Sequence, residues 1–111
     1  MAYQNVVGNR LAQAECTTSY VTVYTTPLLT RTYVKNIDIC NTTAGSLRFY
    51  VHLVPKGDSA GTGNALFYNA PINGTTTVQW TGSEILTPGD LIQIKASAAG
   101  IAVTITGGEA T

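Results

Sequence analysis

Charge is what this sequence has least of. Of its 111 residues only 11% are charged, and six basic side chains balance six acidic ones, whereas an ordinary soluble domain carries about 25% charged residues. A freely diffusing monomer usually relies on net charge to stay apart from its neighbours. A neutral, weakly charged chain therefore favours an oligomer or assembly, in which partners cover much of the surface. The alternative is a mildly polar monomer.

The basic residues are few and scattered, form no run and have no stacking motif beside them. Nucleic-acid binding needs a basic patch that can neutralise several phosphates, so we expect no nucleic-acid partner. Nor does the sequence contain the roughly 18 consecutive apolar residues of a membrane-spanning helix. The N-terminal residues lack the basic and apolar regions of a secretory signal. We expect no membrane partner and synthesis inside a cell.

Histidine and cysteine are also scarce, with one histidine and two cysteines in the whole chain. Cys16 and Cys40 show no Cys-x-x-Cys spacing, which excludes the usual zinc sites, and we expect neither metal nor cofactor. Cys40 ends a strand-like segment and is typical of a small buried apolar residue. A disulfide between the two cysteines is the alternative, although nothing in the sequence indicates an oxidising compartment.

What the chain does contain is apolar residues, at 44%, together with abundant Thr, Ser, Asn and Gly. Threonine is β-branched, fits a pleated strand and tolerates water. The length suits one domain with its own core. Composition alone thus favours a single all-β domain.

Alternation of apolar and polar residues predicts the strands. In the strongest, Leu47, Phe49, Val51 and Leu53 point inward while Arg48, Tyr50 and His52 point outward. Between Val34 and Lys35 the alternation changes, which predicts a bulge. About seven to eight strands are expected, seven of them at residues 19–26, 32–40, 47–54, 65–68, 75–80, 91–95 and 101–106.

Turn signals separate these segments. Asn73-Gly74 predicts a two-residue hairpin, and Pro88-Gly89 predicts a type II turn. Several short strands with turns every 8–15 residues and no intervening helix are typical of an antiparallel two-sheet β-sandwich or small jelly roll.

The first 18 residues lack a sustained period of either two or 3.6. We interpret residues 1–18 as an N-terminal arm that is ordered by contact with something else, and residues 19–111 as the β-sandwich domain. A frayed terminus or an edge strand is the alternative for the arm.

Two strings resemble catalytic motifs. Gly57-Asp58-Ser59-Ala60-Gly61 is similar to the nucleophile loop of chymotrypsin-like proteases, but that fold needs about twice this length and a base held by a buried carboxylate. The segment that begins at Gly61 starts like a dinucleotide fingerprint and lacks its third glycine and its helix. We therefore expect no enzyme, no catalytic residues and no small-molecule substrate.

Tyrosines offer a different kind of site. Tyr20, Tyr24 and Tyr50 fall on strand faces opposite aliphatic residues, and so we expect them to point outward. Tyrosine supplies a large contact area at low entropic cost. These three tyrosines predict a protein interface, and a platform on which sugar rings stack is the second interpretation.

Four segments resemble those of small tailed-bacteriophage virion proteins. These segments are residues 34–41, residues 51–57, Asn64-Ala65-Leu66 and residues 88–97, and the resemblance covers about residues 19–107. It implies a β-sandwich that decorates or cements a capsid, or that serves as an accessory piece of a tail, and it transfers no catalytic residue. Capsid-stabilising proteins often clasp neighbours with an N-terminal arm.

The sequence thus leads to the hypothesis of a structural virion protein, made in the host cytoplasm and located on the capsid surface. Its expected partners are the major capsid protein and its own copies, as a homotrimer. The alternative is a tail-fibre or receptor-binding module that recognises host surface glycans, and an orphan hydrolase is a third. The expected interface residues come from the arm and the tyrosines: Tyr3, Val6, Val7, Arg10, Leu11, Tyr20, Tyr24 and Tyr50.

Overall fold

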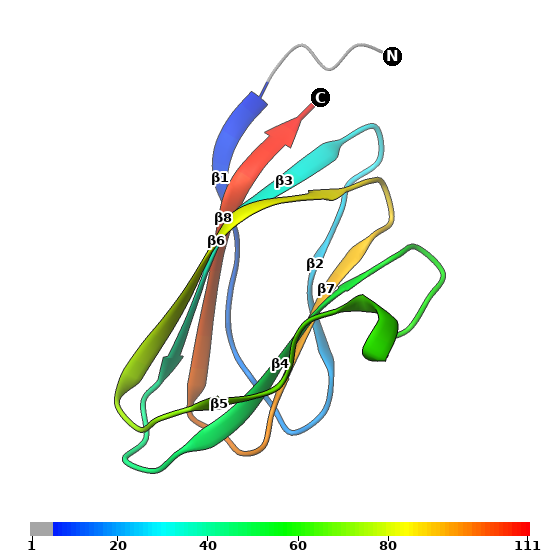
Figure 1. Cartoon of the computed structure of the whole chain (residues 1–111). Coiled ribbons are helices and arrows are strands. Elements are labelled where there is room, and N and C mark those ends of the chain that lie inside the picture. The colour runs from blue at the N-terminus through cyan, green and yellow to red at the C-terminus, as the bar shows by residue number, and fades with distance from the viewer. Residues whose placement is uncertain (1–5) are drawn as a thin grey trace.

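The alternating segments form two antiparallel four-stranded sheets in the computed structural model, which describes residues 6–111 (Figure 1). We call the sheets A and B. The strands of sheet A, in spatial order, are β1 (Val6–Glu15), β8 (Ile101–Ala110), β3 (Arg31–Asn41) and β6 (Thr76–Leu86). The strands of sheet B are β2 (Val21–Thr25), β7 (Leu91–Ala96), β4 (Leu47–Val54) and β5 (Ala65–Ile72).

The strand order is that of a jelly roll. Along the chain β1 pairs with β8, β2 with β7, β3 with β6, and β4 with β5. This is one long hairpin rolled into two layers, and two further pairings, β3 with β8 and β4 with β7, complete the sheets. The expected all-β sandwich of about seven to eight strands is confirmed, and it has eight.

The core lies between the two inner faces and is built mainly from β-branched residues. Ile37 and Ile39 of sheet A and Ile92 and Ile94 of sheet B have no exposed surface, and Phe49 has 1%. In sheet B, three residues of β4 pair with three residues of the neighbouring strand β7: Phe49 with Ala96, Val51 with Ile94, and Leu53 with Ile92. The predicted inward residues of β4 are therefore confirmed.

The bulge predicted near Val34 is confirmed. The register of β3 against both β6 and β8 shifts between Val34 and Asn36. The extra residue, Lys35, is exposed. Because a one-residue insertion reverses the alternation, Val34 on one side of the bulge and Ile37 on the other both reach the core.

The Asn73-Gly74 hairpin has the expected position but a longer loop. β5 ends at Ile72 and β6 begins at Thr76, and the left-handed residue is Thr75, with φ 51°, rather than Gly74. A Cβ on Gly74 would stand 2.2 Å from the Ala44 carbonyl oxygen. Glycine is needed at this position for close approach to the neighbouring loop, and the backbone N–H of Thr75 donates to Thr43 at 2.8 Å.

The predicted turn at Pro88-Gly89 is found where expected. Gly89 has φ +89°, and the backbone N–H of Asp90 donates to the carbonyl of Thr87 at 3.0 Å. Both features are those of a type II turn.

The N-terminal segment is a strand over the part that the structure describes. Val6–Glu15 pairs along its whole length with β8 and forms an edge of sheet A. The edge-strand alternative, rather than a free arm, therefore describes residues 6–15, while residues 1–5 lie outside the described part of the chain. The sequence signal was weak because Val6 to Arg10 are all exposed, so this half of the strand has no buried face.

Tyr24 does not point outward, although the sequence predicted this for Tyr20, Tyr24 and Tyr50. The register of β2 on β7 shifts between Thr22 and Tyr24, which turns Tyr24 toward the gap between the sheets. Its hydroxyl donates to the Glu109 carboxylate at 2.6 Å and lies 2.7 Å from the Thr32 hydroxyl, while Asn9 donates to the other Glu109 oxygen at 3.1 Å. This polar cluster joins the two sheets near the start of β1.

Burial, followed by the hydrogen bond to Glu109, raises the pKa of Tyr24 from 10.0 to about 12. We expect Tyr24→Phe to lower the free energy of unfolding at neutral pH by about 1–2 kcal/mol, because Glu109 and Thr32 lose their partner. Since the folded-state pKa is raised, the contribution of the hydroxyl is full below pH 10 and is lost as pH rises to about 12. Urea unfolding at pH 7, 10 and 12 measures both effects.

The control for this experiment is Tyr33→Phe. Tyr33 is half-buried on sheet A, and its hydroxyl bonds to no other residue in the part of the chain that the structure describes. Equal losses in the two variants would contradict an inter-sheet role for Tyr24.

Both cysteines are free thiols in different settings: Cys16 is buried and Cys40 is half-buried on the outer face of sheet A. Burial, with a smaller effect from Glu15, raises the pKa of Cys16 to about 11. Because the thiolate is the reactive form, we expect iodoacetamide at pH 8 to label Cys40 at least about ten times faster than Cys16. Mass spectrometry of Cys16→Ser and Cys40→Ser separates the two rates, and equal rates would contradict the burial of Cys16.

Candidate functional site

Large apolar side chains that remain exposed fall into two groups. The first, which we call the terminal end, comprises Val6, Val7, Leu28, Leu29 and Ile85, whose exposed fractions run from 54% to 81%. The second belongs to a group of aromatic residues on the outer face of sheet B and contains Tyr20, 36% exposed, and Tyr68, 56% exposed. Exposed apolar residues that gather in one place are typical of contact surfaces.

Strand register brings the terminal end together. Val6 pairs with Ala110, and Ala110 pairs with Arg31, the first residue of β3. The β2–β3 turn that carries Leu28 and Leu29 directly precedes Arg31. Figure 1 shows this turn at the same end of the sandwich as the start of β1 and the C-terminus.

Leu29 holds an unfavourable backbone conformation. It has φ 57°, in the left-handed region that costs an L-residue about 1–2 kcal/mol and that favours glycine or asparagine. Its side chain is 65% exposed, so burial within the described chain does not offset this cost. A leucine in this position contributes little burial to the fold and leaves much apolar surface exposed.

On the outer face of sheet B, two tyrosine rings contact a lysine and a third ring contacts one of those two. We call these residues the tyrosine cluster: Tyr20, Tyr50, Tyr68 and Lys95. Tyr50 and Lys95 are direct partners across β4 and β7. The Lys95 ammonium lies 4.9 Å from the centre of the Tyr20 ring and 4.8 Å from that of Tyr50, within the range of a cation–π interaction.

The tyrosine rings are locked in place. Tyr50 meets Tyr20 and Tyr68 edge-to-face, with ring centres 6.1 and 5.3 Å apart. The Tyr50 hydroxyl donates to the side-chain oxygen of Asn69 at 3.1 Å. Burial by these neighbours, followed by repulsion from the phenols of Tyr68 and Tyr50, raises the pKa of Tyr20.

His52 lies beneath the cluster and is fully buried, although its strand position predicted an outward, solvated residue. Asn64 fixes the histidine tautomer. The Asn64 amide nitrogen donates to Ser59, and its oxygen accepts from the Gly61 N–H and faces His52 Nδ1 at 2.7 Å. Nδ1 therefore carries the proton, and Nε2 accepts from the Tyr20 hydroxyl at 3.1 Å.

The two catalytic look-alikes do not assemble. Both ring nitrogens of His52 are occupied by Asn64 and Tyr20, and neither contacts Ser59. The glycine-rich string leads into a three-residue 3-10 turn, Thr62–Asn64, and then into β5. This turn is too short to offer a helix N-terminus to a phosphate. Among residues 6–111, no group of three or more histidine, cysteine or acidic side chains could hold a metal ion.

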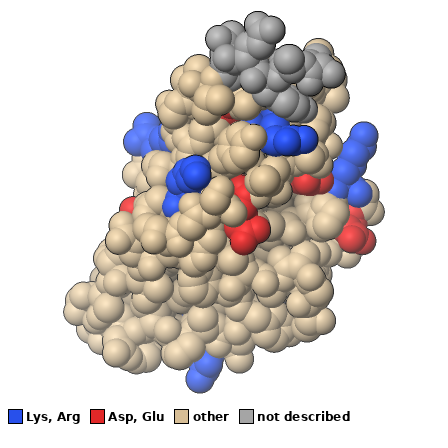
Figure 2. Space-filling view, turned by 45° about the horizontal axis from the view of Figure 1, so that its top comes forward, with Lys and Arg blue, Asp and Glu red and all other residues tan. Residues whose placement is uncertain are grey.

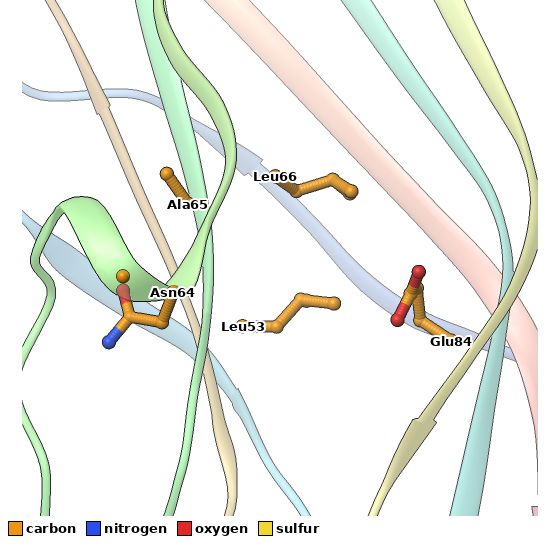
Figure 3. Close-up of a pocket in the computed structure, with 6 residues that line it drawn as sticks. Leu53, Asn64, Ala65, Leu66 and Glu84 are labelled. Carbon is orange, nitrogen blue, oxygen red and sulfur yellow. The ribbon is translucent and has the colours of Figure 1, made fainter.

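A small cleft opens between the edges of the two sheets, where the 3-10 turn Thr62–Asn64 (η1) and β5 approach β6. It has a volume of about 250 Å³ and is lined by Leu53, Leu66 and Glu84, among others. Figure 3 shows the two leucine side chains pointing toward Glu84, while the amide of Asn64 points away. One exposed carboxylate beside an apolar wall does not make an acid–base pair.

The connections at the opposite end of the sandwich, which we call the loop end, carry no charged residue. These connections are residues 42–46, 73–75 and 97–100. They interlock, since Thr42 donates to Gly100 through its backbone N–H at 2.9 Å and through its hydroxyl at 2.7 Å. In Figure 2 the charged side chains gather in the upper part of the view, and the lower part is almost free of them.

The expected interface residues lie in different surroundings. Val6, Val7 and Arg10 are exposed on β1, whereas Leu11 packs against the core. Tyr20 and Tyr50 share the tyrosine cluster, and Tyr24 lies between the sheets. Tyr3 is outside the described residues.

Five residues of the two surfaces were not foreseen: Leu28, Leu29, Ile85, Tyr68 and Lys95. Two consecutive leucines directly after Pro27, in a turn, were the signal that could have identified the terminal end.

We expect His52→Phe to keep the volume of the side chain but to release the loop that Asn64 organises, because Asn64 and Tyr20 would lose their polar partner. Amide hydrogen exchange at Gly61 to Asn64 should accelerate several-fold, with little change in β7. Tyr68→Phe, which alters an exposed ring, is the control. Unchanged exchange in His52→Phe would show that Asn64 organises the loop without the histidine.

No family model and no curated protein matches the sequence. Along residues 6–111, no helix is long and apolar enough to cross a membrane.

Solved structures do resemble the fold. A subunit of the disulfide-linked pili that form Bacillus endospore appendages has a TM-score of 0.53 and 13% identity, over 100% of this chain and 94% of that one. A protein of the T13 particle of infectious bursal disease virus has a TM-score of 0.52 and 11% identity, over 96% of this chain and 30% of that one. In the Gx strain of that virus the TM-score is 0.49, at 10% identity, over 96% of this chain and 32% of that one.

The chain thus spans about a third of the length of the viral proteins and nearly all of the pilus subunit. At these identities the likeness concerns the fold alone: the sandwich is of a type also found in viral capsid proteins and in a pilus subunit.

Proposed function

We propose that this chain is a non-enzymatic structural subunit that works by protein–protein contact, as a decoration or cement protein on the surface of a phage capsid. The observation that carries the proposal is the terminal end. Five large apolar side chains, each more than half exposed, gather there, and one of them is Leu29, whose backbone conformation is strained.

The surroundings of the terminal end support an assembly role. β1 is an edge strand, so one side of its backbone has no partner strand in sheet A. The chain also has no net charge to keep copies apart. A standard interface takes about 800 Å² from each partner, and this chain has 5789 Å² in all. One such contact would cover about a seventh of the surface.

In this proposal the terminal end contacts the major capsid protein and neighbouring copies in a homotrimer. Val6, Val7 and Arg10 lie on the edge strand β1 and belong to the contact, as do Leu28 and Leu29. Tyr3, which is outside the described residues, is proposed to join them. Each copy adds a modest interface, and repetition around a shell multiplies the effect. The virion is the proposed location, after synthesis in the host cytoplasm.

A second candidate is a subunit of a protein filament. The observation that favours it is the match in length, because the pilus subunit is covered over 94% of its chain whereas the viral proteins are covered over about a third. Electron microscopy of the purified protein separates the two candidates. Filaments favour the second, and closed oligomers that bind to capsids favour the first.

The double variant Leu28→Ser with Leu29→Asn tests the contact surface. Asparagine tolerates the left-handed conformation, so we expect the monomer to be as stable as the parent or more stable, by up to about 1 kcal/mol. The lost apolar area should weaken self-association at least ten-fold in sedimentation velocity.

Tyr68→Ser, which removes an exposed ring from another face, is the matched control and should leave self-association unchanged. A parent chain that stays monomeric at all concentrations and binds no capsid would overturn the proposal. So would a double variant that assembles like the parent.

A further inference from the structure

We infer that the tyrosine cluster is a binding site for an acidic sugar, that is, a saccharide ring that carries a carboxylate. This site is separate from the terminal end and does not rest on the proposed assembly role. The structure juxtaposes exposed aromatic rings with a lysine that has no anionic partner among residues 6–111, on a face of the sandwich whose strands carry no acidic residue.

Charge on this face has one sign. The described strands of sheet B contain no aspartate or glutamate, whereas Arg48 in β4 and Lys95 in β7 both point outward. Four of the six carboxylates belong instead to sheet A, one in each of its strands. An anion at the outer face of sheet B would meet two cations and no strand carboxylate.

The Lys95 ammonium is held against two tyrosine rings but forms no ion pair within the described residues. Among residues 6–111, no hydrogen bond to an acceptor engages it either. Its three N–H donors are therefore available to a ligand. Arg48 is partly engaged, because one of its terminal nitrogens donates to the Asn69 carbonyl at 2.8 Å.

The rings are preorganised for stacking. His52 fixes the Tyr20 hydroxyl and Asn69 fixes that of Tyr50, so a ligand need not pay to order them. Tyr68 stands at the edge of the cluster with 56% of its surface exposed. Asn69, with φ 51°, and a shifted register between β4 and β5 place Tyr68 beside Tyr50.

Sugars fit this arrangement better than nucleic acids do. One face of a pyranose ring is a row of C–H groups that packs on an aromatic ring, while its edge offers hydroxyls and, in acidic sugars, a carboxylate for hydrogen-bonded cations. Single-stranded nucleic acid would also stack on tyrosine, but it needs a basic groove along its backbone. Two cations on a chain of zero net charge supply no such groove.

The test uses the full chain and matched pairs of ligands. Oligosaccharides that contain glucuronic acid or sialic acid are compared with the same oligosaccharides after reduction of the carboxylate to an alcohol, by titration calorimetry and by chemical-shift mapping. We expect the acidic form to bind at least ten-fold more tightly and to shift the signals of Tyr20, Tyr68 and Lys95. The preference should fall in 0.5 M NaCl.

Two variants assign the roles. Tyr68→Ala should weaken binding of both ligand forms at least ten-fold, whereas Lys95→Gln should weaken the acidic form to the level of the reduced one. Lys35→Gln, which alters an exposed lysine on sheet A, is the matched control. Thermal unfolding confirms that each variant is folded, and the Leu28/Leu29 double variant should bind the sugar normally even if assembly fails.

Several results would overturn the inference. These are no binding at millimolar ligand, equal binding of the acidic and reduced forms, and no effect of Lys95→Gln. Tighter binding of a single-stranded oligonucleotide would reassign the face to nucleic acid. Loss of self-association in Tyr68→Ala without sugar binding by the parent would reassign it to a protein interface.

Discussion

Contact between the inner faces of the two sheets is the interaction on which this structure depends. In a jelly roll the first strand pairs with the last, so most strand pairings close long loops and cost chain entropy before they contribute energy. Burial of the apolar layer between the sheets offsets that cost, and this layer draws side chains from both sheets. Side chains on the outer faces therefore contribute less than this inner layer to the stability of the fold. Apolar or aromatic residues that gather there call for an explanation other than the stability of one chain.

Alternation of apolar and polar residues predicted the parts of the fold that this inner layer dictates. The inward residues of β7, and those of β8 from Ile101 to Ile105, follow a strict period of two, because each strand has one face on the core. Prediction failed in β2, where an unforeseen register shift of one residue moves a side chain to the other face. This side chain is that of Tyr24, which the shift after Thr22 turns inward to Glu109. β1 was not predicted as a strand, because the first half of this edge strand is exposed and therefore shows no alternation of apolar and polar residues.

The two candidate surfaces were only partly predictable, for a different reason. Tyr20 and Tyr50 could be placed on an outer face from their own strands. Their proximity to Lys95 follows from the pairing of β7 with β2 and β4, which is a property of the topology. Tyr68 joins them only because of the irregular register between β5 and β4. The strain at Leu29 is a backbone angle that residue types alone do not reveal.

The positions of the two surfaces make the proposed roles compatible. The terminal end lies where the strands of sheet A begin or finish, whereas Lys95 and its tyrosines lie on the broad outer face of sheet B. Burial of the terminal end against a shell or a neighbour would therefore leave the tyrosine cluster facing solvent. A shallow site with a few polar contacts binds a sugar weakly in a single copy. Display on a repeating assembly would convert that weak contact into strong attachment, because linked sites bind with a high effective concentration. The assembly would thus give the tyrosine cluster the avidity that one chain cannot supply.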